Sequence, residues 1–215
     1  MTDIAAQSSS IRVRIFVDFW NFSLCLRRLD DNFRIDWRPV SSTFLSEVTK
    51  LIGSPASFEA MHVYGSYDPS KPADTKLRNW FTNTLDRMPG IHVELQERHK
   101  KRHFPKCPSC QHEIESCPEC SSDMRGTEEK GVDTQIVKDM ISLAWEKAYD
   151  VAVLVSNDRD YVPVAEFLQT KGIKVIHGSF PKQGSQLSQR CWGHFDIPTV
   201  MNHFRRATIV TNNNK

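Results

Sequence analysis

The 215-residue chain has no apolar run approaching the roughly 20 residues that a membrane-spanning helix needs. Its first ten residues, MTDIAAQSSS, contain neither a basic flank nor an apolar stretch, so they do not resemble a signal peptide. We therefore expect a cytoplasmic protein with no membrane partner. In that compartment its six cysteines would stay reduced.

The sequence also lacks a marked excess of charge of either sign. Lys and Arg number 28 against 26 for Asp and Glu, which leaves a net charge of +2. The whole molecule therefore has no field that would attract nucleic acid, and any such signal must be local. No serine or cysteine nucleophile with a partnered histidine is visible, so a covalent intermediate is not favoured.

What is present is the pattern of an α/β protein. Continuous or alternating apolar runs predict strands, and apolar residues at helical spacing predict helices between them. The alternation indicates a doubly wound, mostly parallel sheet of five or six strands flanked by helices. The expected strands are 11–17, 61–65, 91–97, 151–155 and 174–180, with a short sixth strand after Cys191. The first three expected helices are 19–29, one capped by Ser42 and ended by Gly53, and 74–88. The others are one that opens at Asp133, one with Pro163 near its first turn and Gly172 after its end, and a final one before Arg206. Residues 184–190 look like a polar loop.

The chain is long enough for one domain with its own core. We expect that domain over residues 11–206, with a basic and cysteine-rich insertion at 98–126. Residues 1–10 are polar and small, and 207–215 are polar, so both ends are expected to be disordered.

Polar side chains follow two of the expected strands and open one of the helices. The carboxyl ends of parallel strands meet at one edge of a sheet, where ligands of open α/β proteins bind. Each of these acids could instead cap a helix, but two caps are not needed at one helix start. The candidates are Asp18 and Asn21 after the first strand, Asp133 in the first turn of a helix, and Asp158 and Asp160 after the strand VAVLV.

Four cysteines form two CPxC turns separated by six residues. Two such turns can supply four thiolates to one tetrahedral zinc ion, which would be a structural site in a small hairpin. The alternatives are two disulfides, which a reducing compartment disfavours, and a redox dithiol, which would need only one pair of cysteines. The ligands would be Cys107, Cys110, Cys117 and Cys120.

A dense basic run precedes the cysteines. It is either a solvated loop or a track for the phosphates of a nucleic acid, and its place beside the acids favours the track. The residues are Arg98, Lys100, Lys101, Arg102 and Lys106, with Lys130 on the far side of the insertion.

The motifs VDFWN, EKGVD and VLVSNDRDYVPV together resemble the NYN domain family, relatives of the PIN and flap nucleases, over Ile11–Phe204. The resemblance implies a metal-dependent ribonuclease that binds Mg²⁺ or Mn²⁺ through a cluster of acids. Asp18 and Asn21 match the family's first motif, Asp133 its helix acid, and Asp158 and Asp160 its strand tip. The bulkier Phe19, Trp20, Asn157 and Arg159 stand where the family often has small residues, and we expect them to narrow the site or stack on a base.

The chemistry agrees with that interpretation. Clustered carboxylates repel one another unless a cation lies between them, and hard oxygen ligands select Mg²⁺ or Mn²⁺. Such an ion activates a bound water for attack on phosphorus. We assign Asp18, Asp133 and Asp158 as principal ligands, Asp160 as a further ligand or the group that orients the water, and Asn21 as a neutral donor to Asp18 or the phosphate.

Three functions compete at this point. The first is a metal-dependent endonuclease, acting on single-stranded or structured RNA. The second is a non-catalytic RNA-binding or scaffold protein with the same fold. The third is a phosphatase with Asp158 as nucleophile, disfavoured because Val162 stands where such enzymes usually have Thr. The sequence leaves open the choice of RNA or DNA, the mode of cleavage and any homo-oligomer.

Overall fold

The computed structural model describes residues 10–181 and 183–207. The ends expected to be disordered therefore lie outside the described residues, apart from residues 10 and 207. Within the described ranges, six strands form one sheet in the order β3-β2-β1-β6-β7-β8, and every neighbouring pair is parallel. The strands are β1 (Ile11–Asp18), β2 (Ala56–Tyr67), β3 (Ile91–Glu97), β6 (Val151–Val155), β7 (Lys174–Ser179) and β8 (Gly193–Asp196). The predicted doubly wound α/β fold is confirmed.

This strand order places a reversal of the chain at the centre of the sheet. From β1 the chain builds outward through β2 and β3, and it then crosses back to β6 on the other side of β1. In such sheets a crevice opens beyond the carboxyl ends of the two central strands, because the connections leave them in opposite directions. Asp18 ends β1, and Ser156 follows β6, so both lie at this switch point.

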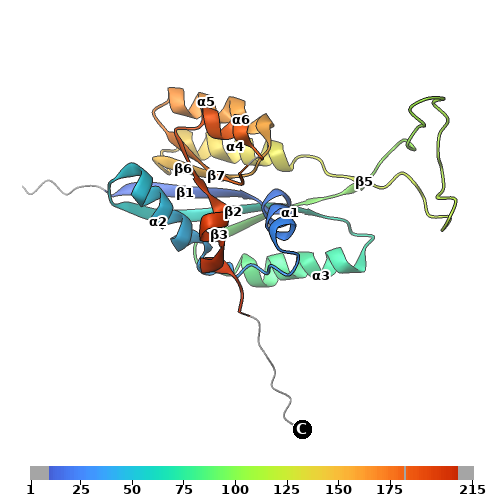
Figure 1. Cartoon of the computed structure of the whole chain (residues 1–215), viewed down its shortest axis with the longest axis horizontal. Coiled ribbons are helices and arrows are strands. Elements are labelled where there is room, and N and C mark those ends of the chain that lie inside the picture. Colours follow the sequence, from blue (N-terminus) through green and yellow to red (C-terminus); the bar gives the residue numbers. More distant parts are fainter. Residues whose placement is uncertain (1–9, 182, 208–215) are drawn as a thin grey trace, which may run out of the picture.

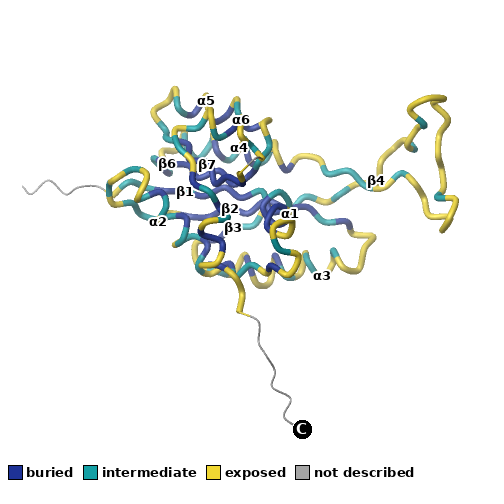
Figure 2. Tube along the Cα trace, in the orientation of Figure 1, coloured by how far each residue is buried: buried dark blue, intermediate teal, exposed yellow. Residues whose placement is uncertain are grey.

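Helices cover both faces of the sheet (Figure 1). The side chains of β1 alternate between two cores: Ile15 and Val17 pack with α1 and α2, whereas Phe16 packs with α4 and α5. Strand β6 is buried at all five positions, as predicted for a central strand covered on both faces (Figure 2). The helical elements are α1 (Phe19–Leu29), α2 (Val40–Ile52), α3 (Pro72–Trp80), η1 (Phe81–Leu85), α4 (Val132–Trp145), η2 (Arg159–Tyr161), α5 (Val162–Thr170), α6 (Ser185–Arg190), α7 (Ile197–Val200) and η3 (Met201–Phe204).

Three local expectations were wrong. Ser42 does not cap α2, which begins at Val40; the Ser42 hydroxyl instead donates to the carbonyl of Pro39 at 3.1 Å. The helix expected over 74–88 is split into α3 and the π-helical turn η1. Residues 184–190 are mostly helix rather than loop, because the fully buried Leu187 anchors α6 to the core. The sequence did not predict this helix, since a single apolar residue produces no helical periodicity.

Residues 98–126, expected to be an insertion, form an arm. Its base is a two-stranded antiparallel ladder of β4 (His99–Lys100) and β5 (Thr127–Glu128). The arm projects from the edge where the strands of the main sheet end, and most of its length is exposed (Figures 1 and 2). It therefore extends outward from the same edge that carries Asp18.

Candidate active site

Asp18 is held in place from both sides of the switch point. One carboxylate oxygen caps α1 by accepting from the backbone N–H of Asn21 at 3.1 Å. The other accepts from the hydroxyl of Ser156, at 3.2 Å, across the junction between β1 and β6. The carboxylate is thus fixed at the mouth of the crevice by groups from two adjacent strands.

Asp133 reaches the same place from the start of α4. It lies in the first turn of that helix, and the hydroxyl of Tyr161 donates to its Oδ1 at 2.6 Å. Tyr161 is only 1% exposed, and burial together with the charges of Asp18, Asp133 and Asp158 raises its pKa far above the ordinary value. The buried phenol therefore contacts Asp133 and is close enough to Asp18 and Asp158 for their charges to act on it.

Asp158 is the third acid of this group. It caps η2 by accepting from the N–H of Asp160 at 2.9 Å, and its own N–H donates to the hydroxyl of Ser156 at 3.3 Å. Ser156 is 2% exposed, and its hydroxyl connects the backbone N–H of Asp158 with the carboxylate of Asp18. One buried hydroxyl thus links the carboxylate of Asp18 to the main chain at Asp158.

The electrostatics of Asp18 reflect this crowding. Its pKa is raised from 3.8 to about 6, first by burial and then by the charges of Asp133 and Glu129, against the lowering effect of its hydrogen bonds with Asn21 and Ser156. Burial and like charges both penalise the ionised carboxylate. A divalent cation would remove this penalty.

Glu129 is an acid of this region that the sequence pattern did not single out. It follows β5, accepts a short hydrogen bond from the hydroxyl of the buried Ser66, and forms a 3.5 Å ion pair with Arg98. The signal that could have found it was its place in the motif EKGVD. Because it raises the pKa of Asp18, it belongs to the same group of charges.

Asp160 and Asn21 are placed differently from expectation. Asp160 is exposed and lines a separate cavity beside Arg159 and Arg190. The side-chain oxygen of Asn21 accepts from the backbone N–H of Asn157 at 3.0 Å, so the amide fixes the segment after β6. The contact with Asp18 comes from the Asn21 backbone.

The bulky residues near the acids serve mainly the interior. Phe19 is 6% exposed and packs in an aromatic cluster, while the side chain of Asn157 contacts Cys25 at 3.1 Å. Trp20 is half-buried, and its indole N–H donates to the carbonyl of Ser66 at 2.9 Å. Of the bulky residues, the half-buried Trp20 and Asn157 and the exposed Arg159 retain surface for a substrate.

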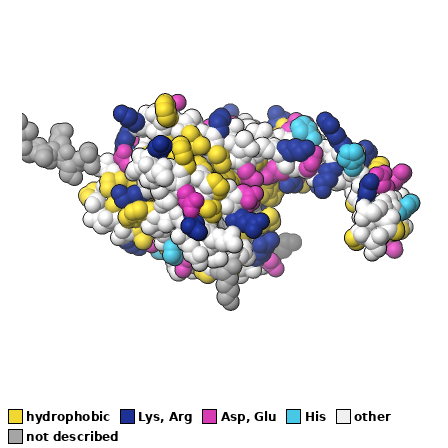
Figure 3. Space-filling view, turned by 90° about the horizontal axis from the view of Figure 1, so that it is seen from above, with side chains coloured by type: hydrophobic (Ala, Val, Ile, Leu, Met, Phe, Trp, Pro, Cys, Tyr) yellow, Lys and Arg dark blue, Asp and Glu magenta, His cyan; other side chains and the backbone are white. Residues whose placement is uncertain are grey.

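The basic residues lie along the arm and at its base, near a group of acidic side chains on the body (Figure 3). Most of them are already paired with carboxylates. In the described part of the chain, Lys101 and Arg102 form no such ion pair, and these two retain the most charge for a phosphate. The pairs are Arg98–Glu129, Lys100–Asp123, Lys106–Glu113 and Lys130–Glu128.

The two CPxC turns have the same backbone. In the first, the N–H of Gln111 donates to the Cys107 carbonyl at 2.9 Å; in the second, ten residues later, Ser121 donates to Cys117 at 2.8 Å. Gln111 and Ser121 share a left-handed conformation, with φ of 60° and 56°. Each turn brings its two cysteines together.

Backbone and hydroxyl groups in these turns favour thiolates. Donors from Cys110 and Ser109 lower the pKa of Cys107, and Ser122 lowers that of Cys120. Thiolates are the form that binds zinc.

Across the described residues, no three Asp, Glu, His or Cys side chains form a group able to hold an ion by themselves. The donor set at the switch point nevertheless fits Mg²⁺ or Mn²⁺, since Mg²⁺ is usually held by one or two carboxylates and keeps several waters. A four-thiolate zinc site needs more, namely that the two turns approach each other.

None of the helices in the described ranges combines the length and the apolar character needed to cross a bilayer.

Comparisons with known proteins identify the family. The model of the NYN domain matches residues 12–197. A protein of unknown function from Vibrio parahaemolyticus has a similar structure, with a TM-score of 0.54 and 18% identity over 87% of this chain and 93% of that chain. UGT73P12 of Glycyrrhiza uralensis matches at a TM-score of 0.30 and 10% identity, over 80% of this chain and 28% of that one. No curated protein matches. Because the family model spans most of the chain, the protein belongs to the NYN domain family of PIN-like nucleases.

Proposed function

We propose that this protein is an endoribonuclease that uses Mg²⁺ or Mn²⁺ to hydrolyse phosphodiester bonds of single-stranded or structured RNA. The observation that carries the proposal is the group of Asp18, Asp133 and Asp158 around Tyr161 at the switch point of the sheet. Members of the NYN family are nucleases that generally depend on divalent metal, which supports the same conclusion.

Asp18, Asp133 and Asp158 would hold the ion, with Glu129 close enough to add charge. When bound, the ion lowers the pKa of a water and stabilises charge on the phosphate. The three carboxylates and Glu129 give the crevice a negative potential that favours a divalent cation over a monovalent one. Asp160 remains a proposed group for orienting water, as an exposed neighbour of Asp158.

Neighbouring groups keep the acids in position. Ser156 orients Asp18, Tyr161 orients Asp133, and Asn21 fixes the backbone that leads into Asp158. Such supporting hydrogen bonds restrict ligand rotamers, and their loss typically weakens metal affinity. Asn21 therefore acts on the site by positioning it.

The arm would hold the RNA backbone. Lys101 and Arg102 would contact phosphates first, because they are not paired with carboxylates in the described structure. Arg98, Lys100, Lys106 and Lys130 would contribute less, since each must leave a carboxylate to bind a phosphate. Contacts of this kind give affinity without reading sequence.

The arm would carry a structural zinc ion on Cys107, Cys110, Cys117 and Cys120. The proposal is supported by the repeated backbone of the two turns and by their lowered thiol pKa values. Zinc would join the turns, since the arm has no apolar core of its own. Protein purified without chelator should contain about one zinc per chain, and Cys107→Ser should reduce it sharply; no zinc in the wild type would refute this site.

The decisive test of cleavage uses labelled RNA and DNA with Mg²⁺, Mn²⁺ or EDTA. Asp158→Asn should abolish cleavage of RNA and leave RNA affinity within about threefold, because one acid is lost from the metal group while the basic arm is unchanged. Asp31→Asn, at an exposed position, is the matched control. Equal cleavage by wild type and Asp158→Asn would refute the assignment. Binding without cleavage by the wild type would favour the non-catalytic alternative.

A further inference from the structure

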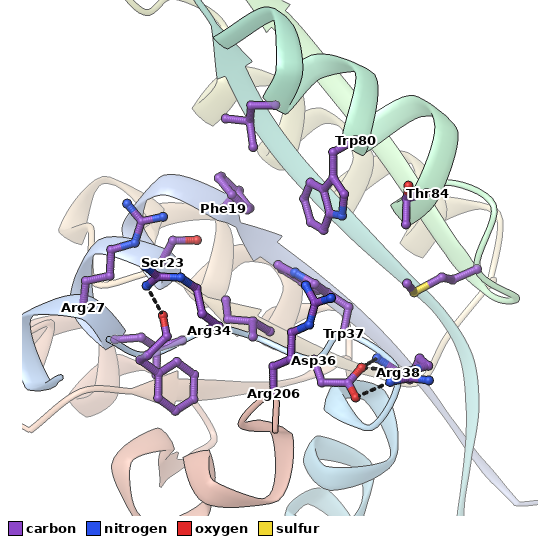
Figure 4. Close-up of a pocket in the computed structure, with 15 residues that line it drawn as sticks. Phe19, Ser23, Arg27, Arg34, Asp36, Trp37, Arg38, Trp80, Thr84 and Arg206 are labelled. Atoms are coloured by element: carbon purple, nitrogen blue, oxygen red, sulfur yellow. Dashed lines mark hydrogen bonds and ion pairs between the residues drawn. The ribbon is translucent and has the colours of Figure 1, made fainter. Parts of the chain in front are cut away.

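A further cavity, lined by none of the acids of the proposed cleavage centre, lies on the face of the sheet covered by α1 and α3. Its volume is about 590 Å³, which is within the range of small-molecule sites. It is lined by one side of α1, the loop of residues 33–38, and α3 with the turn after it (Figure 4). Neither the metal chemistry nor the arm uses this cavity.

One wall of the cavity is aromatic. Trp37 is 3% exposed and stacks on Phe19, with ring centroids 6.1 Å apart and planes at 19°. Trp80 is half-buried, and its ring lies 6.4 Å from that of Trp37 at 50°. Trp80 therefore keeps part of its surface open beside a rigid aromatic cluster, and a flat ring could stack there.

The rim of the cavity is basic. Arg27, Arg34, Arg38 and Arg206 line it, and the one carboxylate among the lining residues, Asp36, is paired with Arg38 at 2.7 Å. Among the described residues, Arg27, Arg34 and Arg206 form no ion pair with a carboxylate. The guanidinium of Arg34 is positioned by the carbonyls of its own loop, at 3.0 Å from that of Phe33. The lining residues thus carry four guanidinium groups against one carboxylate, which is an excess of positive charge.

One buried polar group on this wall has no partner. Ser23, on α1, is 5% exposed, and its hydroxyl makes no hydrogen bond in the described structure. A buried hydroxyl without a hydrogen-bond partner is unfavourable, because it has lost its contacts with water and gained none in return. A ligand or a water in the cavity is the available partner, because the side chain lines it.

We infer that this cavity is a nucleotide-binding site, in which a base stacks on Trp80 and a phosphate binds Arg27 and Arg34. An aliphatic chain would use the apolar wall but not the three unpaired arginines. A bare anion would use the arginines but not the aromatic wall. A nucleotide has both a flat ring and a negative charge, so it matches the two sides together.

The cavity and the proposed cleavage centre include neighbouring residues of the chain. Phe19 forms part of the cavity wall, and it directly follows Asp18 in the chain. The nucleotide could therefore be free in solution or part of a strand that passes the acids. Either source would be recognised by the same ring and phosphate contacts.

The test is calorimetric titration of the full chain in EDTA, so that cleavage plays no part. The probes are AMP, adenosine, inorganic phosphate and a six-nucleotide RNA. AMP should bind at least about tenfold more tightly than adenosine or phosphate alone, and Trp80→Ala should weaken it by about tenfold, in keeping with the value of one stacked base. Arg27→Ala should have a similar effect on AMP and little effect on adenosine.

Two substitutions serve as matched controls. Trp145→Ala removes a tryptophan that is 86% exposed and lies elsewhere, and Arg28→Ala removes the exposed neighbour of Arg27 that does not line the cavity. Arg27 is itself exposed, so its substitution preserves the fold even if Trp80→Ala does not. If the wild type binds the RNA but no AMP, and Arg27→Ala loses the RNA, the nucleotide that occupies the cavity is part of a strand. If Trp80→Ala and Arg27→Ala bind AMP and RNA as tightly as the wild type does, the inference is overturned. It is also overturned if the wild type binds neither AMP nor RNA.

Discussion

Replacing Asp18 with asparagine should stabilise the metal-free protein while it removes metal binding. Asn keeps a side-chain oxygen that can cap α1, and its amide can still donate to or accept from Ser156. What is lost is a carboxylate that is buried and repelled by Asp133 and Glu129. The fold therefore loses an unfavourable charge without losing its cap.

The magnitude follows from the pKa of Asp18. The folded-state pKa of about 6 lies above the unfolded value of 3.8, so the folded protein binds the proton more tightly. The wild type therefore loses stability as pH rises from about 4 through 6, and the full loss is present above that range. A difference of about two pKa units corresponds to about 3 kcal/mol at pH 8, or roughly 6–12 °C in Tm.

The assay is thermal and urea unfolding in EDTA between pH 4 and pH 8. Asp18→Asn should exceed the wild type at pH 8 and lose that advantage toward pH 4, whereas the exposed control Asp31→Asn should follow the wild type. Adding Mn²⁺ at 100 times its Kd should raise wild-type stability by about 2.7 kcal/mol and leave Asp18→Asn unchanged. A variant less stable than the wild type at pH 8 would refute the electrostatic reasoning.

Three further predictions concern residues that contact the acids or the segment after β6, namely Tyr161 at Asp133, His177 at the carbonyl of Ser156, and Gly184 beside Asn157. Tyr161→Phe removes the hydrogen bond to Asp133, so Mn²⁺ affinity by titration should fall about tenfold or more; unchanged affinity would contradict the positioning role. Burial lowers the pKa of His177 from 6.5 to about 4, so between these pH values the unfolded chain binds a proton that the folded protein does not. The free energy of unfolding should therefore fall as pH drops from 6.5 toward 4. His177→Gln should flatten that part of the profile measured by urea unfolding. At Gly184, where φ is +67°, an added Cβ would lie 2.8 Å from the side chain of Asn157, whereas Gly53 has a similar φ of +69° and open space around it. Gly184→Ala should therefore lower Tm by more than Gly53→Ala does. Equal losses of Tm would show that the contact with Asn157 does not matter.

The pattern of apolar residues along the chain was sufficient to predict the layers of this protein. The run Val151–Val155 has no polar residue, which favours a central strand buried on both faces, and the structure buries all five positions. The acids that directly follow strands were found for the same reason, since a strand end fixes where the next residue lies. Local sequence alone was therefore enough to expect Asp18 and Asp158 at one edge of the sheet.

Tertiary structure alone decided which neighbours surround those acids. Glu129 reaches the site because β5 closes the base of the arm, and Tyr161 reaches Asp133 because its ring packs in the same buried cluster as α4. Asp160, only two residues after Asp158, lines another cavity. The cavity beside Trp80 is likewise built from segments that are far apart along the chain. Local patterns of apolar and polar residues encode which face is buried, but contacts across the sheet depend on the three-dimensional packing of all its elements.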